Sequence, residues 1–597
     1  GRCMVPREAT AGRKAQSAGA DDLRIVGAAL KPYRRAFLIA TICAFSEATL
    51  ELFIPFMMAQ MVDVEIPAQD VHGIVLVGAK MVALAVIAGL LGLGYARYSA
   101  IASMGFGANL REAAYAHVQK LSFANLDSFE TSSLVTRLTT DITVIQNALV
   151  QGFRPLLRSP VMLVMGLVLS FTMSAKLAVV FVVVLPCLAL ALFLIVSHAA
   201  PLFSKLQSSM DRLNSALEEN LVAIRAIKAY VREPWAEERF AEVNRRLAGT
   251  ATQTFSTAVL NLPVFQLAMN VTSVALLWFG GQLILAGELG VGALTGFMSY
   301  VLLIMNSLNM FSNVFLLLAR ALTSIHRVGE VLEETPVLAQ LPRGKALGQV
   351  PDGSIAFRDV SFQYAADAEK PVLSHISFAV PAGGTLGILG GTGSGKSSLV
   401  QLLARLYDVS QGTVEVGGHD VREYALPALR DAVGIVLQKN VLFTGTVREN
   451  LKWGNEEATD EELLEACRIA CADEFLERIG GLDGDLGHGG SNVSGGQRQR
   501  LCIARTLLKK PKVLVFDDST SAVDMTTDAK IRRHLAELTD VTKVIVAQRV
   551  ASVADADKIL ILDDGKIEGF GTHEELLARD PIYQELCHSQ GLVGKEA

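Results

Sequence analysis

Six runs of apolar residues, each long enough to cross a lipid bilayer, lie in the first 325 residues of this 597-residue chain. A membrane-spanning helix needs about 20 mostly apolar residues, and every run meets that length. The runs occupy residues 36–62, 73–103, 153–174, 177–200, 254–285 and 291–318. The sequence therefore predicts an all-α, six-helix transmembrane domain over residues 23–328.

Short and long connections alternate between these runs. Residues 104–152 and 201–253 are long, charged and helical in pattern, and the second of them is rich in Lys and Arg. Arg34 and Arg35 precede the first run, whereas residues 63–72 contain neither Lys nor Arg. Because positive charge accumulates on the cytoplasmic side, we expect a multi-pass protein of the cytoplasmic (inner) membrane with both termini in the cytoplasm.

The composition changes after the sixth run. Residues 329–352 are rich in Pro and Gly and read as a linker, and over 353–590 β-rich apolar runs alternate with helical patterns. Residues 1–22 are small and polar and are expected to be a disordered tail without the apolar core of a signal peptide. The net charge of −6 argues against a nucleic-acid partner. The seven cysteines lack metal-ligand spacing and fit a reducing compartment.

Residues 390–397 read G-G-T-G-S-G-K-S and match a phosphate-binding loop at every fixed position. The loop follows the apolar strand 386–389 and precedes a helical pattern, which is the context that this motif requires. Backbone N–H groups of such a loop surround phosphate, Lys396 reaches the β- and γ-phosphates, and the Ser397 hydroxyl binds Mg²⁺. The alternative is a glycine-rich turn, which the apolar strand ending at Asp517 disfavours. The predicted ATP-binding residues here are Gly390, Thr392, Gly393, Ser394, Gly395, Lys396, Ser397 and Ser398.

Five further motifs occur in order along the second half of the chain. They are Tyr364, Gln438, the N-V-S-G-G-Q segment 492–497, the apolar strand ending at Asp517, and the S-A-V-D segment 521–524. Together they closely resemble an ATP-binding cassette domain. Six spans followed by one such α/β domain resemble an ABC half-transporter with the type IV, exporter-type membrane fold, and this resemblance covers almost the whole chain.

The resemblance implies a role for each motif residue. Tyr364 would stack on adenine, although an ordinary strand aromatic is the alternative, and Ser397, Gln438 and Asp517 would hold Mg²⁺. Asp524 would cross a dimer interface. The signature residues Ser494, Gly495, Gly496 and Gln497 would contact the ATP bound to the opposite subunit. Two chains are therefore expected to enclose two ATP molecules between them.

Two residues depart from the family pattern at the chemical centre. Asp518 stands where relatives carry a glutamate that polarises the attacking water, and Gln548 stands where they carry a histidine. An Asp carboxylate would sit about 1–1.5 Å short, and misplacing a general base costs on the order of 10²–10⁴ in rate. An amide cannot carry the charge of an imidazolium or shuttle a proton. We take Asp518, Gln548 and Gln438 as the catalytic positions.

Both departures weaken the ATP site built on this chain, whereas the signature that serves the other site is intact. The sequence thus favours a heterodimer with a slow or silent site on this chain and a competent site on its partner. The alternative is a slow homodimer that tolerates Asp518 and Gln548.

Polar residues inside the apolar runs indicate a substrate cavity. Glu47 and Glu51 share one helical face of the first run and suggest a cationic amphipathic substrate. The other candidates are Gln266, Asn270, Asn306, Asn309 and Asn313. Hydrogen bonding between helices is the alternative for all of them. By resemblance, residues 123–136 and 218–228 would form coupling helices that dock on the cassettes near Gln438.

The function that follows is ATP-driven export of small amphipathic compounds, drug-like or lipid-like. Import of metal–siderophore complexes by the same fold is a second hypothesis, and a regulatory ATP-binding subunit with little catalysis is a third. The expected partners are ATP, Mg²⁺, the bilayer and a second half-transporter.

Overall fold

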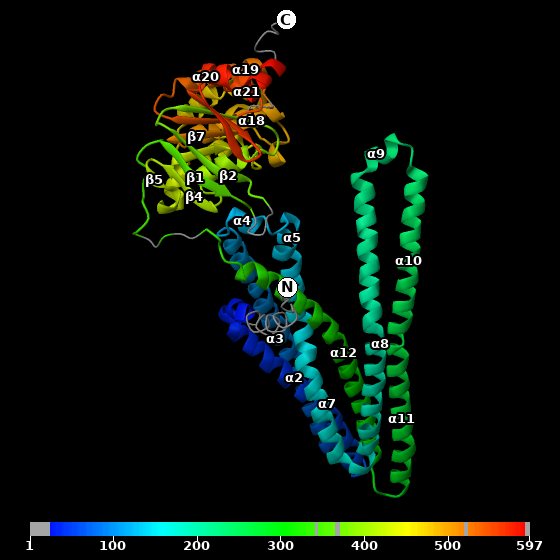
Figure 1. The fold of residues 1–597 in the computed structure, drawn as a ribbon. Coiled ribbons are helices and arrows are strands. Elements are labelled where there is room, and N and C mark those ends of the chain that lie inside the picture. The colour runs from blue at the N-terminus through cyan, green and yellow to red at the C-terminus, as the bar shows by residue number, and fades with distance from the viewer. Residues whose placement is uncertain (1–23, 339–340, 342–343, 365–369, 519–522, 591–597) are drawn as a thin grey trace, which may run out of the picture. The chain divides into compact units, whose positions relative to one another are not determined.

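The computed structural model describes residues 24–338, 341, 344–364, 370–518 and 523–590 (Figure 1). The predicted tail 1–22 and residues 521 and 522 of the S-A-V-D segment lie outside this part of the chain. Contacts divide the chain into two compact units. The first comprises residues 1–119 and 131–333, and the second comprises 120–130 and 334–597.

Six helices in the described residues are long and apolar enough to cross a membrane, as the sequence predicts. They include α2 (Arg34–Gln60), α3 (Val71–Val118), α7 (Phe153–Met173), α8 (Ala175–Val222), α11 (Asn261–Leu285) and α12 (Val291–Glu333). Because α3 and α8 each contain 48 residues, they are longer than the apolar runs within them. At 1.5 Å per residue such a helix extends well beyond the roughly 30 Å of hydrocarbon.

The helices α2, α3, α7 and α12 lie alongside one another, and α8, α10 and α11 form a long hairpin (Figure 1). Phe181 of α8 stacks on Phe297 of α12 with 6.0 Å between ring centroids. The Tyr300 hydroxyl of α12 donates a 2.8 Å hydrogen bond to the Leu52 carbonyl of α2. These contacts belong to one buried apolar cluster that joins both groups of helices.

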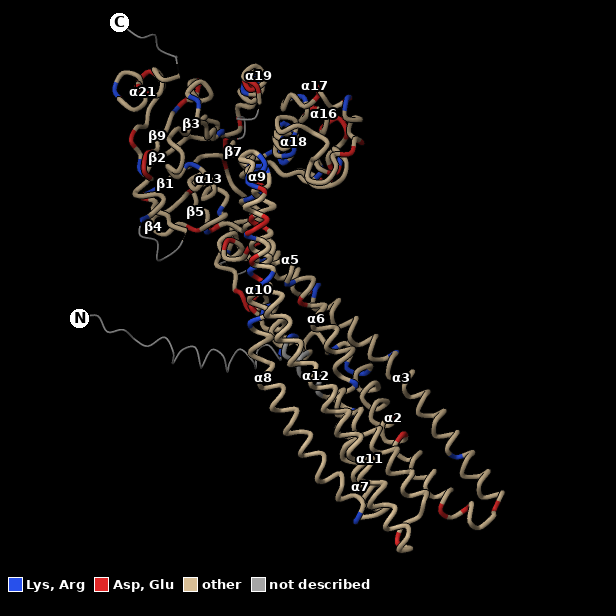
Figure 2. The backbone as a smooth tube through the Cα atoms, turned by 90° about the vertical axis from the view of Figure 1, so that its right-hand side faces the viewer, with Lys and Arg blue, Asp and Glu red and all other residues tan. Residues whose placement is uncertain are grey.

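The first unit contains further helical segments, of which α10 is as long as α2. They are η1 (Lys31–Tyr33), η2 (Met61–Glu65), α5 (Thr131–Thr136), η3 (Arg137–Asp141), α6 (Ile142–Asn147), η4 (Ala148–Gly152), α9 (Ile224–Ala229) and α10 (Glu233–Val259). Charged residues are sparse along most of α2, α7, α8 and α11 and gather on α9 and α10 (Figure 2). This separation fits apolar helices in lipid that continue into water.

The second unit is an α/β domain with two sheets. The six-stranded sheet has the order β10-β9-β3-β8-β7-β6, and every neighbouring pair in it is parallel except β10 with β9. A four-stranded antiparallel sheet has the order β2-β1-β4-β5. The strands are β1 (Ile355–Phe362), β2 (Leu373–Val380), β3 (Thr385–Gly390), β4 (Gln411–Val416), β5 (His419–Asp420), β6 (Val433–Val436), β7 (Val513–Asp517), β8 (Thr542–Val546), β9 (Lys558–Asp563) and β10 (Lys566–Gly571).

The domain also contains α-helices, of which α18, α19, α20 and α21 are labelled in Figure 1. They are α13 (Lys396–Leu403), α14 (Leu426–Ala432), α15 (Val447–Lys452), α16 (Asp460–Ile469), α17 (Asp473–Leu476), α18 (Gly495–Leu507), α19 (Met525–Ala536), α20 (His573–Arg579) and α21 (Pro581–Ser589). Short turns of 3₁₀ helix are η5 (Val421–Glu423), η6 (Glu477–Ile479), η7 (Gly481–Asp483), η8 (His488–Gly490) and η9 (Val550–Ser552). The observed architecture confirms the predicted fold class: a six-helix membrane domain followed by an α/β cassette domain.

The boundary between the two predicted domains differs in detail from the sequence reading. Helix α12 continues to Glu333, so the first five residues of the predicted linker 329–352 are helical. The apolar pattern of the last turns explains the extension, because Val328 and Val331 are buried.

The two predicted coupling segments differ in their surroundings. Residues 218–228 form the end of α8 and most of α9, which belong to the first unit. Within residues 123–136, α4 (Phe123–Leu126) groups with the cassette. The Tyr407 hydroxyl donates a 2.6 Å hydrogen bond to Asp127, and the Phe123 ring lies 6.2 Å from the Tyr407 ring.

Asp63 joins the end of α2 to the beginning of α12. One carboxylate oxygen accepts a hydrogen bond from the Gly292 N–H at 2.5 Å, and the other accepts from the Ala293 N–H at 2.7 Å. First-turn N–H groups such as these have no partner within their own helix, and negative charge is favourable at the start of this 43-residue helix. A Cβ on Gly292 would lie 2.3 Å from the Ala59 carbonyl oxygen, so glycine permits this close approach.

Replacing Asp63 by Asn removes the charge and leaves one acceptor where the structure uses two. We expect Asp63→Asn to lower the free energy of unfolding by about 1–2 kcal/mol, measured by denaturant titration in detergent. Asp70→Asn is the matched control, since Asp70 precedes α3 but its side chain accepts no capping hydrogen bond. Equal losses in both variants would contradict a specific role for Asp63.

Candidate functional site

The phosphate loop 390–397 connects β3 directly to α13. Gly390 has a φ of 155° and Gly395 a φ of 95°, conformations that L side chains rarely adopt. A Cβ on Gly390 would lie 2.2 Å from the Leu562 carbonyl oxygen, so the loop requires glycine there. The strand–loop–helix geometry directs backbone N–H groups at the start of α13 toward one space, as anion binding requires.

Lys396 lies at the centre of this loop. Its ammonium group donates hydrogen bonds to the carbonyl oxygens of Gly390 at 2.9 Å and Gly391 at 2.7 Å. Burial lowers the pKa of Lys396, whereas the carboxylates of Asp518 and Asp517 raise it. A half-buried ammonium is stabilised by negative charge nearby, and a phosphate entering the loop would supply that charge.

The Ser397 hydroxyl donates a 2.8 Å hydrogen bond to Asp517. Asp517 ends the buried strand β7 and is itself only 2% exposed. Burial raises its pKa, the Ser397 hydrogen bond lowers it, and the neighbouring Asp518 raises it again. The Ser397 hydroxyl and the Asp517 carboxylate thus place two oxygen atoms close together, and Mg²⁺ prefers such oxygen ligands.

Gln438 lies two residues beyond β6, and β6 runs parallel to β7 with Val436 opposite Phe516. The carboxyl ends of parallel strands share one sheet edge, so Gln438 stands at the same edge as Asp517. Its side chain is exposed.

Asp518 and Gln548, the two positions that depart from the family pattern, contact each other. The Gln548 amide donates a 2.9 Å hydrogen bond to the Asp518 carboxylate. Asp518 has a φ of 47°, an uncommon value for a residue with a side chain. Burial raises the pKa of Asp518, whereas the hydrogen bond from Gln548 and the charges of Lys396 and Arg549 lower it.

Tyr364 lies beside the phosphate loop. Its hydroxyl is 2.9 Å from the Ser398 hydroxyl, in the first turn of α13. Its ring makes edge contacts with Tyr407 at 5.1 Å and with Phe362 at 4.8 Å. Half of Tyr364 is exposed, so one face of a positioned aromatic ring remains open for stacking.

The signature residues begin helix α18. The Ser494 hydroxyl accepts from the Gln497 N–H at 3.3 Å, and the Gln497 side chain accepts from the Ser494 N–H at 2.9 Å. Ser494 and Gly495 are exposed. Asp524 caps α19 in a similar way, accepting from the Thr527 N–H at 3.0 Å, which lowers the pKa of Asp524. Both helix starts therefore present fixed polar groups to solvent.

In the membrane domain, both glutamates of α2 are paired with arginines of α7. Glu47 accepts from Arg154 and, at 3.3 Å, from Arg158, while Glu51 accepts from Arg158. The Glu47 side chain is only 8% exposed, and one of its oxygens has no hydrogen-bond partner among the described residues. A Cβ on Gly92 of α3 would lie 3.1 Å from Glu47. We call Glu47, Glu51, Arg154 and Arg158 the charge quartet; its formal charges cancel.

The other predicted cavity residues lie on α11 and α12. Gln266 donates a 3.4 Å hydrogen bond to Asn270 one turn later on exposed α11 surface. On α12, Asn306 is exposed and Asn309 is half-buried, while the side chain of Asn313 lies outside the described residues.

Comparisons with known proteins agree with this geometry. Residues 37–308 match the family described as "ABC transporter transmembrane region", and residues 373–521 match the family described as "ABC transporter". This chain belongs to the ABC transporter family. It is an exporter-type half-transporter, with a transmembrane domain and one ATP-binding cassette whose family couples ATP hydrolysis to transport.

Similar proteins extend over nearly the full chain. An uncharacterized ABC transporter ATP-binding protein of Mycobacterium tuberculosis is 37% identical over 94% of this chain and 97% of its own. The ATP-dependent lipid A-core flippase of Desulfotalea psychrophila is 28% identical over 94% of this chain and 97% of its own. A bacterial Atm1-family ABC exporter, solved with ATP bound, has a TM-score of 0.77 at 26% identity, covering 94% of this chain and 99% of its own.

The sequence reading of this ABC half-transporter missed Arg154 and Arg158. Their spacing of four residues matches the spacing of Glu47 and Glu51, and each pair occupies one face of its helix. Matching the spacings of opposite charges between two spans would have identified the quartet. No local pattern indicates that the Gln548 amide meets the Asp518 carboxylate, because the two residues follow different strands, β8 and β7.

Removing Glu47 leaves Arg154 without its carboxylate partner, and removing Arg154 leaves the buried Glu47 with Arg158 as its remaining partner. We expect Glu47→Gln or Arg154→Gln alone to lower the free energy of unfolding by about 3–5 kcal/mol, and the double variant to lose less than the sum. Denaturant titration in detergent measures this coupling. The exposed pair Lys176–Glu288 is the control, since Glu288→Gln should cost about 0–1 kcal/mol. Additive losses at Glu47 and Arg154 would contradict the pairing.

Proposed function

We propose that this chain is one subunit of a heterodimeric ABC exporter of small amphipathic compounds, with a slow or silent ATP site on its own cassette. The observation that carries this proposal is the hydrogen bond between the Gln548 amide and the Asp518 carboxylate. In an exporter cassette these two positions are where a general base and a switch residue act on the attacking water and the γ-phosphate.

The pair disfavours proton abstraction at this site. Burial raises the pKa of Asp518, but the amide N–H of Gln548 occupies one of its carboxylate oxygens, and the shorter Asp side chain stands farther from the phosphate loop than Glu would. The Gln548 amide cannot accept the proton in turn. ATP binding does not require either group, because Lys396, Ser397 and Asp517 retain the family arrangement.

The Mg²⁺ of this family would be held by Ser397, Asp517 and Gln438, and it would neutralise phosphate charge when bound. Lys396 and the backbone N–H groups of residues 390–397 would orient the phosphates. Ser494 and Gly495, exposed at the start of α18, would reach the ATP on the partner subunit. ATP would thus hold the two cassettes together, and turnover at the partner's site would reset the transporter.

The charge quartet argues against the cationic substrate that Glu47 and Glu51 suggest when only the sequence is considered. Because Arg154 and Arg158 compensate Glu47 and Glu51, the first span offers no net negative charge for a cation. We therefore propose a drug-like or lipid-like amphipathic substrate without a required positive charge. The similarity to a protein named as a lipid A-core flippase supports the lipid-like choice. The similarity to a solved structure described as a bacterial ABC exporter supports export as the direction.

The steady-state ATPase activity of the purified chain alone tests the proposal. We expect near-background turnover, and an increase of on the order of 10²-fold in Asp518→Glu/Gln548→His, since a placed base contributes about 10²–10⁴. Adding Lys396→Ala to that variant should abolish the gain and so assign it to this site.

Brisk Mg²⁺-dependent turnover by the unmodified chain would contradict a silent site. The protein would then be a homodimeric pump in which Asp518 suffices as the base. ATP binding that drives no transport, even with the partner subunit present, would favour a regulatory subunit instead.

Tyr364 offers a separate test of ATP recognition. We expect Tyr364→Ala to weaken ATP affinity by about 1–3 kcal/mol, because stacking on a base is lost. Tyr364→Phe keeps the ring and loses only the hydroxyl contact with Ser398, so its affinity should stay close to that of the original chain. Equilibrium binding of a fluorescent ATP analogue measures both, and equal losses would contradict stacking.

A further inference from the structure

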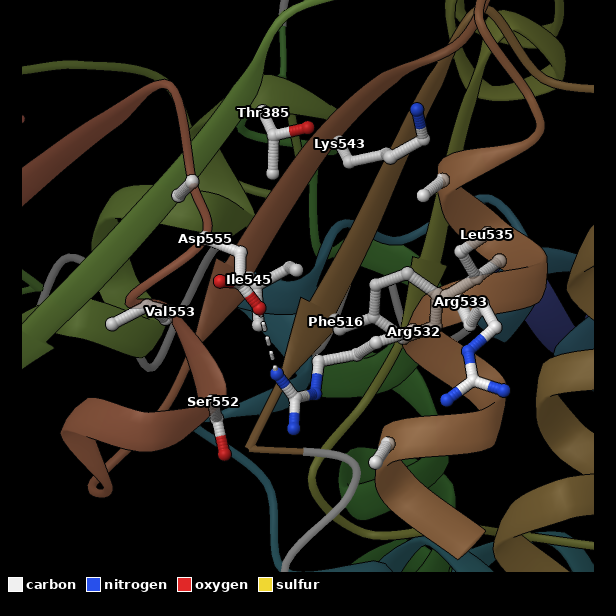
Figure 3. A pocket seen from close by; sticks show the side chains of 13 residues that line it. Thr385, Phe516, Arg532, Arg533, Leu535, Lys543, Ile545, Ser552, Val553 and Asp555 are labelled. Carbon is white, nitrogen blue, oxygen red and sulfur yellow. Dashed lines mark ion pairs between the residues drawn. The ribbon is translucent and has the colours of Figure 1, made fainter.

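A groove in the cassette lies outside the ATP-binding motifs. Its volume is about 390 Å³, and it runs between α19 and the segment 552–556, over strands β7 and β8 (Figure 3). Such a volume is within the range of small-molecule sites. All of its walls belong to the cassette unit. Phe516, Leu535, Ile545 and Val553 provide its apolar surface.

The charged residues that line this groove are mostly basic. Arg532, Arg533 and Lys543 line it together with one acid, Asp555 (Figure 3). The Arg533 side chain is exposed and makes no ion pair or hydrogen bond with the described residues. Lys543 is 5% exposed and donates a 2.7 Å hydrogen bond to the Leu538 carbonyl. The Arg533 guanidinium, which has no side-chain partner among the described residues, favours an anion in this groove.

We propose that this groove binds a small amphipathic anion and that its occupancy regulates the ATP site of the same cassette. Arg533 and Arg532 hold the anionic group, and the apolar body lies on Phe516, Leu535 and Ile545. This inference goes beyond the proposed transport function and does not depend on it, because none of the ATP-binding or signature residues lines the groove.

Arg532 provides the connection to the ATP site. It contacts Asp555 in the groove at 3.7 Å and Asp528 at 3.2 Å. Asp528 lines a neighbouring cavity of about 130 Å³ together with Asp518 and Gln548. Asp528 is 8% exposed, and its second oxygen has no hydrogen-bond partner in the described part of the chain. An anion that draws Arg532 into the groove removes charge compensation from Asp528 beside the ATP site.

Calorimetric titration of the full chain in lipid nanodiscs with naphthalene-2-sulfonate, a water-soluble aromatic anion, tests the binding. Neutral 2-naphthol has a similar ring system without the charge, and empty nanodiscs give the background. We expect the sulfonate to bind at least about tenfold more tightly than 2-naphthol, since only the sulfonate accepts charged hydrogen bonds from the arginines. Equal binding of the two probes, or binding no greater than to empty nanodiscs, would overturn the proposal.

Two variants locate the site. Arg533→Gln should weaken sulfonate binding by about tenfold, and Ala529→Phe, on the exposed wall formed by α19, should block the groove while keeping every charge. Lys566→Gln on strand β10 makes the same charge change elsewhere on the cassette and should leave binding unchanged. Unaltered binding in Ala529→Phe, or an equal loss in Lys566→Gln, would assign the binding to general surface charge.

The regulatory part has its own readout. Saturating sulfonate should change the affinity for ATP by at least about fivefold, the lower end of ordinary coupling between sites. The change should disappear in Arg533→Gln, whose ATP affinity without sulfonate also checks its folding. Sulfonate binding with unchanged ATP affinity would overturn the regulatory role.

Discussion

The parallel pairing of β3, β8 and β7 is the constraint on which the cassette depends. Its register places Val546 opposite both Ile388 and Asp517. The three chain segments that leave these strands therefore emerge at one edge, and they carry the phosphate loop, Asp518 and Gln548. Residues more than 150 positions apart meet because a parallel sheet aligns its carboxyl ends. No single motif could form the site without this register.

The membrane domain obeys a different constraint, the cost of charge in a low-dielectric medium. Four charged side chains lie where α2 and α7 pack together, and they are tolerated because each acid has a basic partner. The arrangement fixes how α2 and α7 face each other, since a rotation of either helix would separate the pairs. Without the two arginines, Glu47 and Glu51 would be read as a cation site.

The sequence was sufficient wherever a pattern is local. Apolar length identified six spans, and glycine spacing located a strand–loop–helix unit whose Gly390 must adopt a φ of 155°. Contacts between distant segments were not predictable. Nothing near Asp63 indicates that its carboxylate meets the N–H groups of Gly292 and Ala293, and nothing near Arg532 indicates a link from a groove to Asp528. Such contacts follow from tertiary packing, which propensity and periodicity do not encode.

The contact between Asp518 and Gln548 indicates that the two departures from the family pattern are coupled. Two independent losses would leave two unrelated polar side chains at the site. Here the amide of one satisfies the carboxylate of the other at 2.9 Å, so each change makes the other less costly. A histidine at 548 could accept a proton or carry charge, and a glutamate at 518 could reach farther toward the phosphate loop. The observed pair holds a partly buried carboxylate in place and uses neither capacity, which is the physical basis of the slow site that we propose.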